Sequence, residues 1–336
     1  AWLSCEEIDG GLGWVCAPSG RRPAELRPAV GEFALAATAV DPDGETLYLT
    51  EDRPDGRFYR FTPDVYPDLT AGTLEVAQVD SSGGVTWLAV PDPSAADTPT
   101  REQVPDSTAF DGGEGVWYDQ GSVYFTSKGD DHVRRYDTGG ETIEIVYDGS
   151  GELTGVDNIT LEPGTGDLYV AEDGGNMEVV ILTPEGDTVP FVRIVDEGVP
   201  ADGLPSEITG PAFSPDGTRL YFASQRGGPS NRGVSYEVTG PFRAADAGAT
   251  ATTATTLAGT IGEDTSSPSG SEVLEGDDDG GSDSALPLVG GAMVLGLAAT
   301  GAAVWWVRNR ANGAEGGSDD RAETEGGDGS DPPESR

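Results

Sequence analysis

A short strand-like pattern recurs along residues 2–224 and constrains the fold more than any other feature. Four segments start at a Gly-containing turn and continue as an alternating run: residues 44–52, 121–127, 166–173 and 217–224. Residues 2–5 fit as a first copy without its turn. One aromatic position recurs in all five copies: Trp2, Tyr48, Tyr124, Tyr169 and Tyr221. The steps between these positions are 46, 76, 45 and 52 residues. Three steps match a four-stranded blade of about 40–50 residues, and the long one predicts an insertion near residues 80–110.

The repeat predicts an all-β fold, a β-propeller over residues 1–242. The chain opens at Ala1 within a strand-like segment, so we expect a signal and part of the domain to precede it. With that part, the propeller would have six blades. A β-sandwich is the alternative architecture, but it does not predict a repeat of this period.

The C-terminal quarter has a different character. Residues 285–307 carry no charge over 23 positions, which is enough for a helix spanning about 30 Å of hydrocarbon. Trp305 and Trp306 stand where interfacial aromatics belong, and Arg308 and Arg310 follow them. The pattern predicts a single-pass anchor in the cell membrane, with the propeller extracytoplasmic and an acidic, disordered tail (308–336) in the cytoplasm. Residues 243–284 read as a disordered Thr/Ser/Gly/Asp-rich stalk. The alternative for 285–307 is a buried core helix.

Charge and motif content exclude several functions. The formal net charge is −41, and a phosphate backbone would be repelled, so no nucleic-acid binding is expected. Such acidity fits either hydration in strong salt or a bias in codon usage. His132 is the single histidine, which argues against a Ser-His-Asp hydrolase and a His-rich zinc site. No Gly-rich phosphate loop precedes a helix, which argues against P-loop or Rossmann nucleotide binding.

Hairpin geometry predicts where charged residues gather. In each repeat one strand precedes the turn and another follows it, so the first strand's start and the second strand's end share an edge. The second strands end at Cys5, Glu51, Ser127, Glu172 and Ser224. The first strands start near Ala36, Glu114, Asn158 and Gly210, with Glu207 just before the last. We therefore expect carboxylates and a thiol at one mouth of the channel, where cations would relieve their repulsion. Oxygen ligands suit calcium, and a thiolate among carboxylates suits iron or another transition metal.

Several motifs resemble PhoX-type alkaline phosphatases. They occur in one order over residues 1 to about 225: WLSCEE (2–7), LTEDR (49–53), DGRFYRF (55–61), AGTL (71–74), EGVW (114–117), DNIT (157–160) and SEITGP (206–211). The resemblance implies a six-bladed propeller with iron and calcium at the channel mouth. It also implies hydrolysis of small phosphate esters outside the cytoplasm under phosphate limitation.

The resemblance further implies roles for individual residues. Cys5 would be the iron-binding thiolate, with Glu114 beside it, both catalytic. Further metal ligands would be Glu51, Glu172 and Glu207, with Asn158 a ligand or a positioning group. Arg53 could orient a phosphate by a bidentate contact, and Lys128 could reach the same mouth.

From the sequence alone, these residues could also have purely structural roles. Arg53 could instead pair with Asp52 or Asp55, and Lys128 could be a surface lysine. Glu51, Glu114 and Glu172 could be solvated strand ends. Cys5 could form a disulfide with Cys16, as a cysteine pair in an exported protein often does.

One segment departs from the family pattern. The family reads Phe-x-His-Glu-Ala-Ala before its first Val-Asp strand, whereas this chain has Leu35 and Ala36 where the His and Glu would stand. If that Glu binds metal, one metal position is weakened or empty. The leading hypothesis is a membrane-anchored, extracytoplasmic, metal-dependent phosphatase. The alternative is a catalytically impaired metal-binding propeller that acts as a cell-surface binding module, and a weaker one is a propeller lactonase or another calcium-dependent hydrolase.

Overall fold

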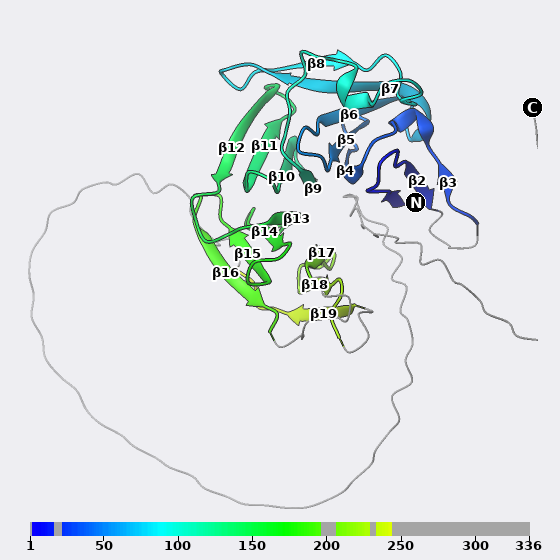
Figure 1. The fold of residues 1–336 in the computed structure, drawn as a ribbon. Helices are drawn as coiled ribbons and strands as arrows, with labels where there is room; N and C mark the ends of the chain where they lie inside the picture. Colours follow the sequence, from blue (N-terminus) through cyan, green and yellow to red (C-terminus); the bar gives the residue numbers. More distant parts are fainter. Residues whose placement is uncertain (1, 17–21, 196–205, 229–232, 244–336) are drawn as a thin grey trace, which may run out of the picture.

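The computed structural model describes residues 2–16, 22–195, 206–228 and 233–243, which form five antiparallel sheets around a common centre (Figure 1). The first sheet holds β1 (Trp2–Cys5), β2 (Gly13–Cys16) and β3 (Glu25–Leu26). The second holds β4 (Leu35–Asp41), β5 (Thr46–Glu51), β6 (Phe58–Val65), β7 (Asp68–Val79) and β8 (Val85–Ala89). The third holds β9 (Gly113–Asp119), β10 (Ser122–Ser127), β11 (His132–Asp137) and β12 (Thr142–Asp148).

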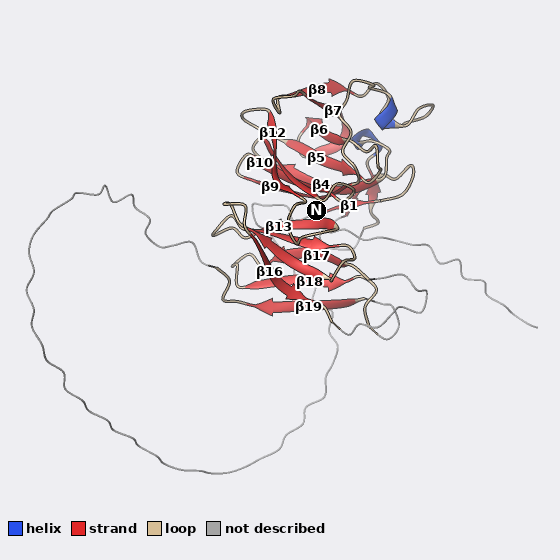
Figure 2. Cartoon of the chain, turned by 60° about the vertical axis from the view of Figure 1, so that its left-hand side comes forward, coloured by secondary structure: helices blue, strands red, loops and turns tan. Residues whose placement is uncertain are grey.

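The last two sheets complete the described arrangement. The fourth holds β13 (Val156–Leu161), β14 (Leu168–Glu172), β15 (Glu178–Leu182) and β16 (Thr188–Arg193). The fifth holds β17 (Ile208–Phe213), β18 (Arg219–Ser224) and β19 (Val234–Thr239). In the described ranges the helical elements are two single 3₁₀ turns, η1 (Pro28–Val30) and η2 (Thr100–Glu102) (Figure 2).

The predicted all-β, propeller-like fold is therefore confirmed, with five sheets. Strands β4, β9, β13 and β17 are innermost and lie side by side around the centre. The 76-residue step is accounted for by β8, the extra fifth strand of its sheet, and by the loop that carries η2 before β9. A sixth blade stays a prediction.

Aromatic side chains between sheets explain why the repeat keeps its aromatic position. Tyr48 lies 5.6 Å from Tyr136 between ring centroids, and Tyr169 lies 4.9 Å from Phe213, each pair joining neighbouring sheets. Phe58 of the second sheet stacks on Phe125 of the third at 4.3 Å. Neighbouring sheets thus bury aromatic side chains against each other, and this burial favours their packing side by side.

All four innermost strands carry a β-bulge where they pair with the second strand. In β4, β9 and β13 the extra residue follows the first pair, between Leu35 and Thr38, Gly113 and Val116, and Val156 and Ile159. In β17 it follows the second pair, between Thr209 and Ala212. A bulge adds one residue to one strand and redirects the local side chains. The repeated bulge therefore sets which side chains face the channel mouth.

The cysteine pair does not form the disulfide that sequence left open. In the β1–β2 hairpin, Cys5 pairs with Gly13, and Cys16 pairs with Trp2 at the other end. Three residues of strand separate the two levels, about 10 Å at the usual rise. Both thiols are free, so the disulfide interpretation is wrong.

The predicted stalk, membrane helix and tail (243–284, 285–307 and 308–336) lie outside the described residues, apart from Arg243 at the start of the stalk. Within the described part of the chain, none of the helices has the length and apolar character needed to cross a membrane.

Candidate metal centre

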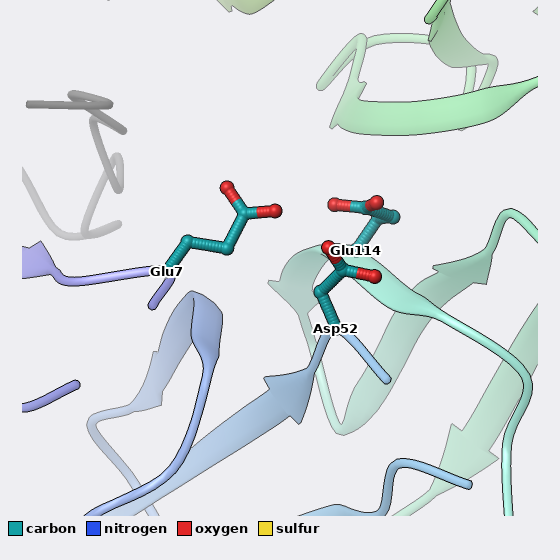
Figure 3. Close-up of side chains that lie close together, drawn as sticks. All are labelled: Glu7, Asp52 and Glu114. Atoms are coloured by element: carbon teal, nitrogen blue, oxygen red, sulfur yellow. The ribbon is translucent and has the colours of Figure 1, made fainter. Parts of the chain in front are cut away.

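Six carboxylates gather in two groups of three, close to where the innermost strands begin and the second strands end. We call this end of the sheets the mouth. The first acidic group is Glu7, Asp52 and Glu114, and the second is Asp157, Asp173 and Glu207. Within each group the ligand oxygens lie within 4.8 Å of one another. Figure 3 shows the first group, whose side chains point toward one another from three separate segments.

A repeated backbone hydrogen bond places one residue of each repeat at this mouth. In each of four sheets, the residue just after the second strand donates its backbone N–H to a carbonyl. That carbonyl belongs to the residue just before the innermost strand. The bonds are Asp52 to Ala34 (3.0 Å), Lys128 to Gly112 (2.8 Å), Asp173 to Gly155 (2.8 Å) and Gln225 to Glu207 (2.9 Å). The four sites are thus equivalent, and two of them supply a carboxylate to the acidic groups.

The bulges of β9 and β13 position two of the buried carboxylates, Glu114 and Asp157. Glu114 and Asp157 occupy the same place in β9 and β13, one residue past the first pair with the second strand. Their backbone carbonyls accept hydrogen bonds from the preceding sheet: Thr50 bonds the Glu114 carbonyl, and Thr126 bonds that of Asp157 at 2.5 Å. These threonines fix the two carboxylates across the boundary between sheets.

Glu51 and Glu172 do not join the acidic groups, contrary to the predicted convergence. Each turns into its own sheet and accepts the backbone N–H six residues later, from Arg57 at 3.2 Å and from Glu178 at 3.0 Å. Side chains alternate along a strand, so residues one position apart face opposite ways. The sequence reasoning selected the last strand residue, whereas the residue after it faces the mouth.

Cys5 is also displaced by one position from its predicted place. The N–H of Leu12 bonds the Glu6 carboxylate at 3.3 Å, and the N–H of Glu6 bonds the Leu12 carbonyl at 3.2 Å. Glu51 has the same pair of bonds with Arg57, so Glu6 is its equivalent, and Glu7 is the equivalent of Asp52. The exposure of Trp2 agrees with this one-residue shift. Trp2 is 52% exposed, whereas the aromatic residue of the repeat is expected to pack between sheets.

The surroundings of Cys5 are apolar. It belongs to a buried cluster that includes Leu35, Leu49 and Phe61, and its Sγ lies 3.3 Å from the Thr38 hydroxyl. Burial raises the pKa of the Cys5 thiol to about 12, the Thr38 contact offsets part of this, and the charge of Glu7 adds to it. Among the described residues Cys5 is in neither acidic group. Its predicted position beside Glu114 is therefore not observed.

Lys128 joins the two acidic groups. Its Nζ lies 2.6 Å from Oε1 of Glu114 and 2.9 Å from Oδ2 of Asp173. Burial opposes the charge on Lys128, yet Glu114, Asp157 and Asp173 together raise its pKa above the ordinary value. The predicted reach of Lys128 to the mouth agrees with this geometry, whereas a substrate contact stays a prediction.

Asn158 and Glu207 both lie at the second acidic group. The amide of Asn158 donates to Asp157 at 2.6 Å, and its oxygen accepts from the Thr209 hydroxyl at 2.8 Å and the Gly210 N–H at 2.7 Å. This arrangement makes Asn158 a positioning group that links Asp157 to the fifth sheet. Glu207 is 1% exposed, and Arg226 Nη1 lies 3.7 Å from its carboxylate.

Arg53 pairs with Asp9, which belongs to neither acidic group. Its guanidinium pairs with Asp9, with Nε at 3.1 Å, and another nitrogen donates to the Asp52 carbonyl at 2.8 Å. The expected alternative partners, Asp52 and Asp55, are replaced by Asp9. Arg101 instead contacts Asp55 at 3.1 Å and Glu51 at 3.4 Å.

The bulge of β4 contains Ala36, one of the two residues that differ from the His-Glu pattern of the family. Ala36 stands one residue past the first pair, where β9 has Glu114 and β13 has Asp157. It is 2% exposed and offers no ligand atom. The mouth therefore lacks one carboxylate at this repeat position.

The carboxyl groups of the mouth interact strongly with one another. Burial raises the pKa of Glu114 to about 8, against the attraction of Lys128 and with a further contribution from Asp52. Burial, then the charge of Glu114, also raises the pKa of Asp157 well above its ordinary value. Burial opposes ionisation of Asp173 too, but its hydrogen bond with Glu207 and the charge of Lys128 lower its pKa. A bound cation would favour the ionised form of all six groups.

The donor atoms limit the class of metal ion that the acidic groups could hold. Both groups offer carboxylate oxygens alone, and Glu114, Asp157 and Glu207 are buried. Hard cations such as calcium bind such oxygen sets, whereas thiolate ligands favour softer metals. The acidic groups could hold a hard cation, and neither group contains the thiolate ligand that was predicted for iron.

Sequence reasoning missed Glu7, Asp52, Asp157 and Asp173. A signal for three of them was present, because the acidic pairs 6–7, 51–52 and 172–173 recur at the same place in the repeat. In each pair the first residue bonds its own sheet and the second faces the mouth.

Comparison with known families confirms the predicted resemblance for part of the chain. The family model described as alkaline phosphatase PhoX matches residues 16–137. This segment includes the whole second sheet, with Asp52, and the mouth residues Glu114 and Lys128 of the third. Glu7 and all of the second acidic group lie outside it.

Solved structures with similar folds include proteins of diverse kinds. A nidogen/laminin complex has 15% identity and a TM-score of 0.42, with 67% of this chain and 70% of that chain covered. A luciferin-regenerating enzyme has 14% identity and a TM-score of 0.35, with 71% and 88% covered. A calcium-binding protein, regucalcin from Agrobacterium tumefaciens, has 16% identity and a TM-score of 0.33, with 72% and 92% covered. No curated protein matches the chain.

Proposed function

We propose that the protein is a metal-dependent phosphatase that hydrolyses small phosphate esters at the mouth of its propeller. The observation that carries the proposal is the pair of acidic groups joined by Lys128, in a chain whose residues 16–137 match the PhoX family model. We also propose that the domain is extracytoplasmic and anchored in the cell membrane through residues 285–307, as their uncharged composition favours.

The two acidic groups would hold the metal ions, with calcium as the cation that their oxygens fit best. Bound metal ions polarise phosphoryl oxygens and lower the pKa of a coordinated water. The protein's own part is positioning. Asn158 holds the carboxylate of Asp157, and the Thr50 and Thr126 hydroxyls hold the backbone of Glu114 and Asp157. Groups fixed in advance stabilise developing charge without reorganising during the reaction.

Lys128 would provide positive charge close to a bound phosphate ester. The side chain of Lys128 is 30% exposed, and its ammonium contacts carboxylates of both acidic groups. Transfer of a phosphoryl group spreads negative charge over its oxygens, and cations around them lower the barrier.

Phosphate release from p-nitrophenyl phosphate tests the proposal. We expect the purified chain to release phosphate with added calcium, or with calcium plus ferric iron, and to be inactive in EDTA. Glu114→Gln and Asp173→Asn should each lower the rate at least 100-fold, since each removes a ligand from one group. Glu75→Gln is the matched control, because this carboxylate pairs with Arg60 at 2.6 Å between β6 and β7 and belongs to neither acidic group. Absence of phosphate release under every metal condition would refute the activity.

The alternative is a metal-binding propeller that has lost catalysis and acts as a cell-surface binding module. Ala36 favours it, because the repeat position that carries Glu114 and Asp157 elsewhere has no ligand here. Calcium binding at the mouth without phosphate release from any simple monoester would support this alternative.

A further inference from the structure

The mouth contains a charge reversal at one repeat position. Asp52, Lys128, Asp173 and Gln225 stand at equivalent sites, defined by the same backbone bond to the innermost strand. Two of these sites are acidic, and Glu7 is the equivalent in the first sheet. The third sheet has a lysine there, the only lysine of the chain.

The contacts of Lys128 resemble those of a bound cation. Its Nζ contacts one carboxylate oxygen from each acidic group, at 2.6 Å from Glu114 and 2.9 Å from Asp173. Calcium binds carboxylate oxygens at about 2.3–2.6 Å, only slightly closer. An ammonium in this place occupies the space between the groups and repels any metal ion that would enter it.

The charge balance leads to the same conclusion. Six ionised carboxylates carry six negative charges, and Lys128 with Arg226, which lies 3.7 Å from Glu207, offsets two of them. Four negative charges remain, which two divalent cations would neutralise. Without Lys128 the same carboxylates would attract a third cation.

We propose that Lys128 is a built-in cation that divides the mouth into two separate metal sites and excludes metal from the position between them. The inference rests on the proposed metal centre and adds the number and separation of its ions. It makes Lys128 a positioning residue, which acts through Glu114 and Asp173.

Equilibrium dialysis of the whole chain against calcium chloride tests the inference. We expect wild type to bind two calcium ions at the mouth and Lys128→Ala, which leaves room for an ion, to bind one more. Lys128→Arg should keep the wild-type number, because it keeps the charge. Arg135→Ala is the matched control, since Arg135 pairs with Glu144 at 2.8 Å on the outer strands. It removes one positive charge and should leave the number unchanged.

Thermal unfolding provides a second measurement. Lys128→Ala should melt lower than wild type in EDTA, because Glu114 and Asp173 lose their shared cation, and it should gain more from added calcium. Lys128→Met, closer in volume, replaces Lys128→Ala if the latter fails to fold. Equal calcium numbers and equal calcium-induced shifts in wild type and both neutral variants would overturn the inference while leaving the metal centre intact. Absence of calcium binding in all of them would overturn the metal centre as well.

Discussion

Glu51 and Asp52 are consecutive residues whose carboxylates serve different parts of the fold. Glu51 is completely buried in its own sheet and accepts the hydroxyl of Tyr59 at 2.9 Å, whereas Asp52 faces the mouth with Glu7 and Glu114. The same division recurs at Glu172 and Asp173. The repeats with adjacent acids at 6–7, 51–52 and 172–173 therefore each contain one structural and one site-forming acid.

This division predicts opposite effects of two neighbouring substitutions. Glu51→Ala leaves the Arg57 N–H and the Tyr59 hydroxyl without their acceptor, which costs about 1–3 kcal/mol for each buried group. Urea unfolding in EDTA should show this loss, while calcium binding by the folded fraction stays at the wild-type number. Asp52→Asn should do the reverse, with little change in unfolding and one calcium site lost. Equal effects of the two variants on both measurements would contradict the division.

Stability without metal should depend on pH through Glu114. Burial raises its pKa from the ordinary 4.5 to about 8, so between these values the folded state binds a proton that the unfolded state has released. The free energy of unfolding should therefore fall as pH rises from 4.5 to 8, by at most about 1.4 kcal/mol per pH unit for one group. Asp157, also raised, acts in the same direction over its own range.

The measurement is urea unfolding in EDTA at several pH values, for wild type and for Glu114→Gln. The variant should show a shallower decline. Calcium affinity should rise over the same range, because the ion displaces the proton. A stability that increases from pH 4.5 to 8 in EDTA would contradict this account of Glu114.

The two thiols should be free and unequal in reactivity. In urea without reductant, a disulfide-exchange reagent should titrate two thiols per chain, because Cys5 and Cys16 lie at opposite ends of their hairpin. In the native chain at pH 8, Cys5 should not react, since it is buried and its pKa is raised to about 12. Cys16→Ser isolates Cys5 for this measurement. Rapid labelling of native Cys16→Ser would place Cys5 at an accessible, metal-binding position instead.

The sequence predicted the all-β, propeller-like arrangement of the described sheets, and it predicted the acidic groups less well. The recurring strand and its aromatic residue gave the propeller, because burial between neighbouring sheets requires them. Glu51 and Glu172 each lie one position before the residue that faces the mouth, and alternation along a strand makes a one-residue error reverse the direction of a side chain. Cys5 lies two positions before Glu7 and is buried among apolar side chains. The bulge in each innermost strand adds one residue to that strand, and a periodic sequence pattern does not predict its position. Four residues selected from the sequence, Glu114, Asn158, Glu207 and Lys128, lie at the acidic groups, and their roles as ligands or substrate contacts stay predictions.

Restoring the family carboxylate at Ala36 should reveal what the mouth lacks. Ala36→Glu places a carboxylate at the position equivalent to Glu114 and Asp157. Without metal it should destabilise the fold by about 1–3 kcal/mol, because a buried charge lacks a partner. With calcium it should recover most of that loss and show a higher rate of phosphate release. Ala39→Glu, at an equally buried site of β4 away from the mouth, should be destabilised with or without calcium.

The number of calcium ions bound by wild type, Asp52→Asn, Asp173→Asn and the double variant tests the central claim most directly. The two acidic groups predict two ions in wild type, one in each single variant and none in the double variant. Equal calcium numbers in all four proteins, or none in wild type, would show that these carboxylates do not form the metal centre.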